Sequence, residues 1–208
     1  TLGSSAVWLG KLQQELGRML DLASENVDAA FQAVISGPDE KTEKAIHTEE
    51  LVDLLNKEIS HYVAKAMVRE TNAEDSAAVA SGFRIAGNIE RISDHAMNIL
   101  GYGQRLEKEN IQLSDEALKE LMEMRTVCAK ALRYLHGESR LDNAAQLEQT
   151  IDDMTVRFRE NHMRRMQNGE CSDEGCILYS EILTDFERVG DHVLNIAQEL
   201  SRTSQVLA

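Results

Sequence analysis

The feature that most constrains this chain is a twelve-residue stretch that occurs twice. Residues 185–196 read DFERVGDHVLNI, and residues 88–99, located 97 positions earlier, read NIERISDHAMNI. Six of the twelve positions are identical: a Glu, an Arg, an Asp, a His, an Asn and the final Ile. A repeat spaced by nearly half of the 208 residues indicates two copies of one structural unit. Since a helical core needs only apolar residues, the repeated polar residues indicate a function.

The composition and the spacing of apolar residues favour long helices. The chain has one Pro and 12 Gly, which is about half the usual share of these helix-breaking residues. Apolar residues recur near helical spacing in six stretches, namely residues 7–35, 40–69, 72–108, 114–136, 142–167 and 172–203. We therefore predict an all-α fold of six long antiparallel helices in two tandem three-helix bundles. The first bundle comprises residues 1–109 and the second comprises residues 110–208.

The charge and the cysteines limit the partners and the location. The net charge is −14 and is shared evenly between the halves. A surface this negative disfavours nucleic acid and anionic lipid as partners, and it favours cations. No run of 18 apolar residues occurs, so no membrane-spanning helix is predicted. The three cysteines fit a cytoplasmic, reducing compartment. Cys171 and Cys176, five residues apart in an expected turn, could pair or bind metal, but no second Cys or His pair completes a zinc site, so we expect them, like Cys128, to be free thiols.

Each half of the chain carries two Glu-x-x-x-Asp pairs. They are Glu49 with Asp53, Glu90 with Asp94, Glu148 with Asp152, and Glu187 with Asp191. Residues four apart are neighbours on a helix surface, where two carboxylates repel one another unless a cation lies between them. A single pair of this kind usually belongs to a solvated acidic face. Four pairs in register across a duplicated unit favour a second interpretation, in which the pairs converge into open, carboxylate-rich metal sites.

The types of residue around these pairs limit the chemistry. Oxygen ligands favour magnesium, manganese, calcium or iron over copper, with zinc as an alternative. His95 and His192 directly follow the motif Asp residues, and we expect them to pack or to support the ligands rather than to bind metal. Arg91 and Arg188 are expected to form ion pairs. No nucleophile constellation and no phosphate-binding glycine loop occurs, so we predict no catalytic residues and no enzyme.

Both copies of the motif resemble the signature of a known family. Residues 186–196 closely resemble the signature of PhoU, a family of phosphate-uptake regulators, and residues 88–99 resemble its first-half counterpart. The resemblance covers nearly the whole chain. It implies two similar three-helix bundles that hold multinuclear iron or zinc clusters on their surface through Glu/Asp-x-x-x-Asp motifs. The oxygen ligands leave manganese and magnesium as alternatives. The implied metal ligands are Glu49, Asp53, Glu90, Asp94, Glu148, Asp152, Glu187 and Asp191.

A narrower resemblance concerns residues 162–172 and 177–191. They look like the PhoU-type domain at the cytoplasmic C-terminus of bacterial sodium/phosphate cotransporter family proteins. This resemblance implies a metal-binding regulatory domain at the inner face of the cell membrane, with a transporter as its partner, either fused upstream or separate. A homodimer is a further expected assembly. Under this interpretation the apolar start of the chain, around Trp8, packs either on such a partner or on its own bundle.

Two alternative functions stay open at this point, besides a purely structural helical adaptor that binds no metal. The first is a free-standing phosphate-uptake regulator of the PhoU type. The second, less favoured, is a di-iron carboxylate protein, whose ligands lie inside a four-helix bundle and include Glu-x-x-His twice. Residues Glu58 to His61 supply that motif only once, and the repeated carboxylates are expected to face away from the apolar seam.

Overall fold

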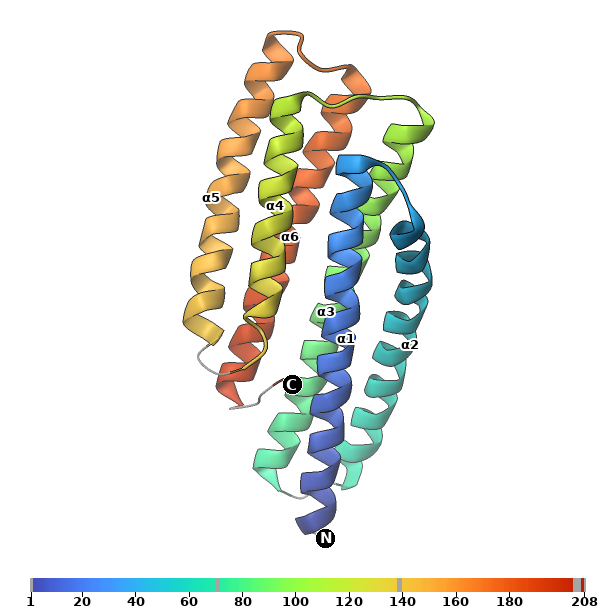
Figure 1. Cartoon of the computed structure of the whole chain (residues 1–208). Helices are drawn as coiled ribbons and strands as arrows, with labels where there is room; N and C mark the ends of the chain where they lie inside the picture. The colour runs from blue at the N-terminus through green and yellow to red at the C-terminus, as the bar shows by residue number, and fades with distance from the viewer. Residues whose placement is uncertain (1, 70–71, 138–139, 204–206, 208) are drawn as a thin grey trace.

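The computed structural model describes residues 2–69, 72–137, 140–203 and 207, and the chain is all-α, as predicted. The helices are α1 (Leu2–Ser36), α2 (Glu40–Arg69), α3 (Ala73–Lys108), α4 (Asp115–Arg133), α5 (Arg140–Gln167) and α6 (Asp173–Arg202). Figure 1 shows them as long rods joined by short turns, so that helices that follow one another run antiparallel. The main difference from the prediction is α1, which begins at Leu2 rather than near residue 7.

Side chains and a glycine fix the helix ends. Ser114 and Ser172 are the N-caps of α4 and α6, and each hydroxyl oxygen accepts a hydrogen bond of 3.1 Å from a backbone N–H three residues further on. Helix α1 ends before Gly37, whose φ of 87° suits a residue without a Cβ atom. Pro38 follows and cannot continue the helix. Local residues thus determine where the chain turns back.

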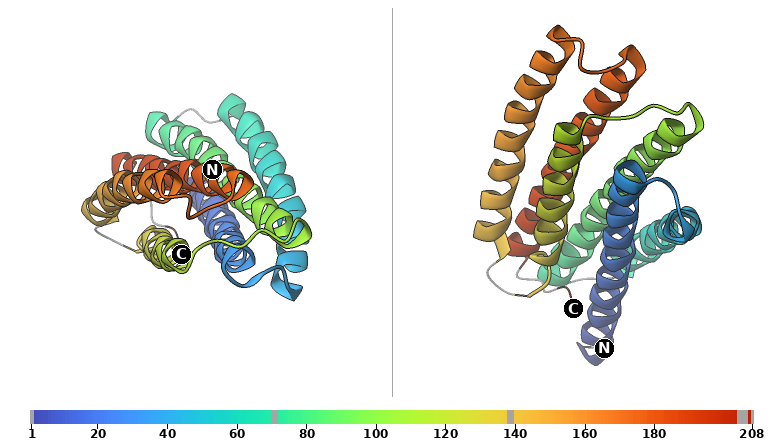
Figure 2. Two further views of the ribbon diagram at one scale, coloured as in Figure 1. Left: turned by 90° about the horizontal axis from the view of Figure 1, so that it is seen from above. Right: turned by 45° about the horizontal axis from the view of Figure 1, so that its top comes forward.

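Four helices form the centre of the molecule. Helix α1 packs on α3 and α4, and α6 also packs on α3 and α4. Helix α2 flanks α1 and α3, whereas α5 flanks α4 and α6, and these two helices lie on opposite sides of the molecule (Figures 1 and 2). The first three helices therefore lie beside the last three. Among the described helices, none has a stretch long and apolar enough to cross a membrane.

One hydrophobic core runs through both halves. Four apolar side chains of the repeated motif, Ile89, Ile92, Val189 and Val193, are at most 1% exposed. They belong to a single cluster of buried residues contributed by all six helices. The division into bundles of residues 1–109 and 110–208 stays a prediction, because the halves share this core.

The close contact between α1 and α3 requires a glycine. A Cβ atom built on Gly103 would lie 2.7 Å from the carbonyl carbon of Ala33 and 2.9 Å from its Cβ atom. These separations are far below van der Waals contact, and one of them involves backbone that cannot rotate away. Gly103 therefore sets how closely the two helices approach.

The prediction of free thiols is wrong for one pair of cysteines. Cys171 and Cys176 form a disulfide, with Cα atoms 6.0 Å apart, whereas Cys128 is a buried free thiol. The turn between α5 and α6 brings the pair together around the N-cap Ser172, at a separation that a disulfide can span. The argument from free thiols to a reducing compartment therefore does not apply to this pair.

Candidate metal centres

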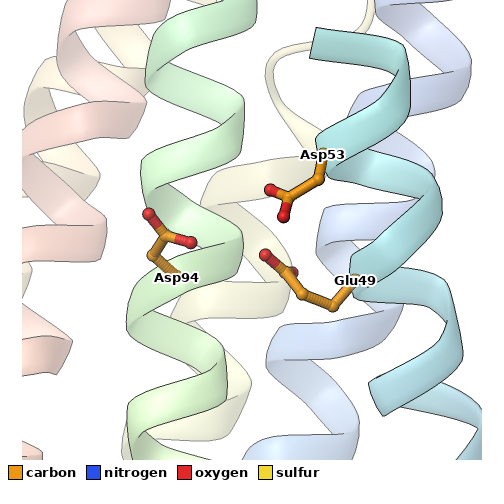
Figure 3. Close-up of side chains that lie close together, drawn as sticks. All are labelled: Glu49, Asp53 and Asp94. Atoms are coloured by element: carbon orange, nitrogen blue, oxygen red, sulfur yellow. The ribbon is translucent and has the colours of Figure 1, made fainter. Parts of the chain in front are cut away.

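The first carboxylate cluster lies between α2 and α3. Helix α2 presents Glu49 and Asp53 one turn apart, and α3 presents Asp94 beside them. One carboxylate oxygen of each residue lies within 4.8 Å of the other two. Figure 3 shows the Glu49 and Asp53 carboxylates pointing from α2 toward α3, on which Asp94 lies. The structure thus brings together three of the four candidate ligands of the first half.

The second cluster repeats this arrangement between α5 and α6. Glu148 and Asp152 come from α5 and Asp191 comes from α6, again with one carboxylate oxygen of each within 4.8 Å of the others. All three side chains are half-buried. Since α5 and α6 occupy in the second half the places of α2 and α3 in the first, the two clusters are equivalent positions of the duplicated unit.

The remaining candidates, Glu90 and Glu187, precede the motif Asp residues by one turn and lie outside the two groups of three. Glu90 is nevertheless part of the same electrostatic field. Burial, followed by the negative charges of Asp94, Asp53 and Glu49, raises its pKa to about 7. The charge of Glu187 likewise contributes to the raised pKa of Glu148.

One glutamate of each cluster, Glu49 in the first and Glu148 in the second, has a pKa above that of an isolated carboxyl group. Burial raises the pKa of Glu49 to about 7, and the charges of Asp53 and Asp94 act in the same direction, against a hydrogen bond from Ser93. Burial and the charge of Asp152 raise the pKa of Glu148. Crowded, half-buried carboxylates of this kind favour any positive charge placed among them, whether a proton or a metal ion.

The ligand atoms suit a hard metal ion. Each group of three supplies carboxylate oxygens from two helices, the ligand type that magnesium, manganese, calcium and iron prefer and that zinc accepts. An ion about 2.0–2.5 Å from each oxygen is compatible with the separation of these oxygens. The residues present therefore fit a metal ion, which would offset the mutual repulsion of the carboxylates.

The repeated His and Asn residues join the two halves. His95 Nδ1 donates a 2.7 Å hydrogen bond to Asp185 Oδ1, which also accepts from Asn98 Nδ2 at 3.1 Å. The repeat produces the reverse contacts, in which Asn88 Oδ1 accepts from His192 Nδ1 at 3.0 Å and from Asn195 Nδ2 at 3.3 Å. The two imidazole rings stack with centroids 5.4 Å apart.

These cross-contacts explain why the motif repeats more than its carboxylates. The expectation that the two His residues pack rather than bind metal agrees with their position in the interface between α3 and α6. Burial, followed by the positive charges of His95 and Arg91, lowers the pKa of His192 to about 4. Among the motif Arg residues, Arg188 forms an ion pair with Asp191 at 3.3 Å.

A buried charged group in the second half was not predicted from the sequence. Arg165, 1% exposed, lies 2.8 Å from Glu120, and Glu120 also accepts hydrogen bonds from Tyr179 and Asn161. These side chains come from α4, α5 and α6, so spacing along one helix gives no signal of their meeting. The group joins the three helices of the second half with polar contacts inside an otherwise apolar core.

The fold and the sites define a class: a duplicated helical-bundle protein with one carboxylate cluster between the second and third helices of each repeat. The sequence model of the PhoU domain matches residues 16–102 and 121–200, that is, both repeats. The chain belongs to the PhoU family.

Relatives with this architecture carry names that refer to phosphate transport. The chain is 27% identical over 196 residues to the phosphate-specific transport system accessory protein PhoU homolog 1 of Thermotoga maritima, covering 91% of this chain and 84% of that protein. It is also 27% identical over 196 residues to the PhoU homolog of Xylella fastidiosa, covering 92% and 81%, respectively.

Solved structures of the family share the fold. The crystal structure of PhoU from Pseudomonas aeruginosa superposes with a TM-score of 0.86 at 18% identity, covering 98% of this chain and 99% of that one. The phosphate transport system regulatory protein PhoU from Streptococcus pneumoniae gives a TM-score of 0.84 at 22% identity, with the same coverage. All six helices therefore have counterparts of similar arrangement.

Proposed function

We propose that this chain is an accessory protein that regulates phosphate transport and that its two carboxylate clusters bind metal ions. The observation that carries the proposal is the match of the PhoU domain to both repeats, combined with a carboxylate cluster at the same place in each. The names of the relatives connect the family to phosphate-specific transport systems. Regulation requires no chemistry on phosphate, and we assign no catalytic residue.

A free-standing regulator is the better-supported form of this function. The relatives that span most of the chain carry the names of accessory proteins of a transport system, whereas the likeness to a sodium/phosphate cotransporter domain rests only on the short segments 162–172 and 177–191. The start of α1 also gives no support for a partner at Trp8. This ring stacks on Tyr62 of α2 with centroids 4.3 Å apart, and Leu12 is 2% exposed. A regulatory domain of a sodium/phosphate cotransporter is thus the second candidate for the function of this chain.

The proposed partner is a membrane transport system, met at the cytoplasmic face of the membrane. An accessory protein controls such a partner by binding its different states with different affinity. Metal ions would contribute by bridging α2 to α3 and α5 to α6, since each cluster draws ligands from both helices of its pair. The cation is proposed to be iron or zinc, with manganese or magnesium as alternatives. Homodimer formation remains a prediction.

Metal analysis and phosphate uptake test the two parts of the proposal. We expect the purified protein to contain metal at both centres and the Asp94→Asn/Asp191→Asn variant to contain little. Cells that lack the gene should take up phosphate at an altered rate across a range of external phosphate. The wild-type protein should restore normal uptake, and the double variant should restore it less well.

A matched control is Glu160→Gln, an exposed carboxylate on α5 outside both clusters. This variant should keep the metal and restore uptake fully. If the wild-type protein has no effect on uptake at matched expression, the regulatory role is wrong. If it regulates uptake but neither contains metal nor binds added metal, only the metal part is wrong.

The di-iron carboxylate protein is disfavoured by the geometry. Glu58 and His61, which form the Glu-x-x-His motif, are exposed on α2 rather than directed into the core. The clusters themselves lie between a flanking helix and a central helix of each half. They therefore do not form the internal four-helix site that this chemistry uses.

A further inference from the structure

The two carboxylate clusters differ in what lies behind them. The repeat places Ser93 and Gly190 at equivalent positions, one residue before the motif Asp. Ser93 is fully buried, and its hydroxyl donates a hydrogen bond to the Oε2 atom of Glu49. Glu49 is one of the candidate metal ligands of the first cluster. Gly190 has no side chain, so Glu148 of the second cluster has no such contact from this position.

A second buried side chain holds the serine in place. Asn26 on α1 is 0% exposed, and its Nδ2 donates a 3.1 Å hydrogen bond to Ser93 Oγ. With one lone pair occupied by Asn26, the Ser93 hydroxyl directs its proton to Glu49. The result is a chain of polar contacts from α1 through α3 to the carboxylate on α2.

Asn26 is poorly explained by stability alone. Within the described part of the chain its Oδ1 atom is buried without a hydrogen-bond partner. An unpaired buried polar atom costs about 1–3 kcal/mol, and an apolar residue would avoid that cost. The second half shows such a solution. Leu16 and Met19 of α1 align with Leu121 and Met124 of α4, 105 residues later, and in that alignment Ala131 replaces Asn26.

The surrounding apolar residues differ in a matching way. Val52 of α2 corresponds to Ile151 of α5 in the aligned Glu-x-x-x-Asp segments. A Cβ atom on Gly190 would lie 3.0 Å from Ile151 Cγ2 and 3.2 Å from its Cδ1. The larger Ile151 thus packs against Gly190, which has no side chain. In the first half, the smaller Val52 occurs together with Ser93, which has one. Three positions therefore change together between the halves.

We infer that Asn26 and Ser93 are positioning residues that hold Glu49 for a metal ion, so that the first centre binds metal more tightly than the second. The inference rests on the proposed metal binding. Groups that hydrogen-bond a metal ligand fix its orientation before the ion arrives, and their loss typically weakens metal affinity about 10–100-fold. The second centre has the same three carboxylates without this support and is the weaker of the two.

The test isolates the first centre and removes the hydroxyl group. In the Glu148→Gln/Asp191→Asn background, calorimetric titration with Mn²⁺ reports the first centre alone. We expect Ser93→Ala to weaken Mn²⁺ binding on the order of tenfold, and Asn26→Ala to weaken it in the same direction. Ser93→Gly combined with Val52→Ile and Asn26→Ala, which copies the second half at all three positions, should give the affinity of the second centre, measured in the Glu49→Gln/Asp94→Asn background.

The titrations distinguish a failure of the positioning role of Asn26 and Ser93 from a failure of the proposed metal binding. If the wild-type protein binds no Mn²⁺ at either centre, and no Zn²⁺ or Fe²⁺ either, the metal proposal itself fails. If Mn²⁺ binds but the affinity of the first centre is unchanged by Ser93→Ala, the positioning role is wrong, even where the melting temperature of the metal-free protein falls. Equal affinities of the two centres in the unmodified protein would also overturn it.

Discussion

His95 Nδ1 lies 2.7 Å from Asp185 Oδ1, so a hydrogen bond from the first half of the chain ends on a carboxylate of the second half. The reverse contact runs from His192 to Asn88, at 3.0 Å. The acceptors are equivalent positions of the repeat, yet one is a carboxylate and the other an amide. The side chain of Asp185 is only 7% exposed, which makes its negative charge dependent on the groups that donate to it.

Removing the Asp185 carboxylate should destabilise the contact between the halves. Asp185→Ala leaves the donors of His95 and Asn98 without their shared acceptor; since His95 is part-buried and Asn98 is exposed to solvent, we expect a loss of about 1 kcal/mol in the free energy of unfolding. Asp185→Asn copies Asn88 and should cost less. Urea denaturation measures both values. Asp153→Ala, on the exposed face of α5, is the control, and equal losses in Asp153→Ala and Asp185→Ala would contradict the prediction.

The raised pKa of Glu90 predicts how stability depends on pH. A folded-state pKa of about 7, against 4.5 for the free side chain, contributes stability that is fully present below about pH 4.5 and is lost as pH rises through 7. Glu90→Gln mimics the protonated form. In the presence of a metal chelator, the free energy of unfolding of the variant should equal that of the wild type at pH 5 and exceed it at pH 8. The difference should be on the order of 1 kcal/mol, because solvent screens a side chain this exposed.

A second group, His192, also makes the stability of the protein depend on pH. His192, whose pKa is lowered to about 4, contributes stability that is present above pH 6.5 and is lost as pH falls toward 4, so it opposes Glu90 over part of the same range. Subtracting the two urea midpoints at each pH cancels this contribution. Parallel pH profiles for the two proteins would show that Glu90 does not hold its proton in the folded state.

Removing one member of the buried ion pair between Glu120 and Arg165 should lower the free energy of unfolding more than removing both members. Glu120→Ala removes the buried partner of Arg165 and leaves this buried charge with only the half-exposed Glu116, 3.4 Å away, for which we expect a cost of about 3 kcal/mol. Glu120→Leu combined with Arg165→Met removes both charges and should cost less than the single change. Chemical denaturation provides the comparison. A double variant that is less stable than Glu120→Ala would contradict the prediction.

Two glycines on the same helix should respond in opposite ways to alanine. Gly103→Ala places a methyl group against the backbone of Ala33, and we expect a loss of about 1–3 kcal/mol from overpacking. A Cβ atom on Gly101 would have no atom within 4 Å, so Gly101→Ala should stabilise α3 by about 0.5–1 kcal/mol. Melting temperatures that move in the same direction for both variants would argue against this account of helix packing.

The helices and the carboxylate pairs are predictable because both are local patterns. Apolar spacing and Pro38 place the helix boundaries, and the Glu-x-x-x-Asp spacing puts two carboxylates on one face of a helix. The duplicated motif adds that both halves have the same arrangement. This is sufficient for the fold class and for the choice of candidate ligands, though not for which three of the four meet in each half.

What the sequence does not reveal depends on pairs of residues far apart in the chain. Asn88 and Asp185 differ between the repeats and were not recognised as the acceptors for the repeated His and Asn residues. Asn26 lies on α1, outside every motif, and meets Ser93 only because the helices pack. Tertiary packing decides these contacts, and no local spacing encodes them. The disulfide between Cys171 and Cys176 is a local exception, because a five-residue spacing in a turn is compatible with either a bond or two free thiols.

The reciprocal contacts of α3 and α6 have the form of an isologous interface, the kind by which two identical subunits form a symmetric dimer. His95 reaches position 185, and His192 reaches position 88. Here the two participants belong to one chain, so their association is intramolecular and does not depend on protein concentration. Dilution cannot separate the halves, and substitutions can still arise in one half without changing the other. That freedom is what allows Asp185 to stand opposite Asn88 and Gly190 to stand opposite Ser93.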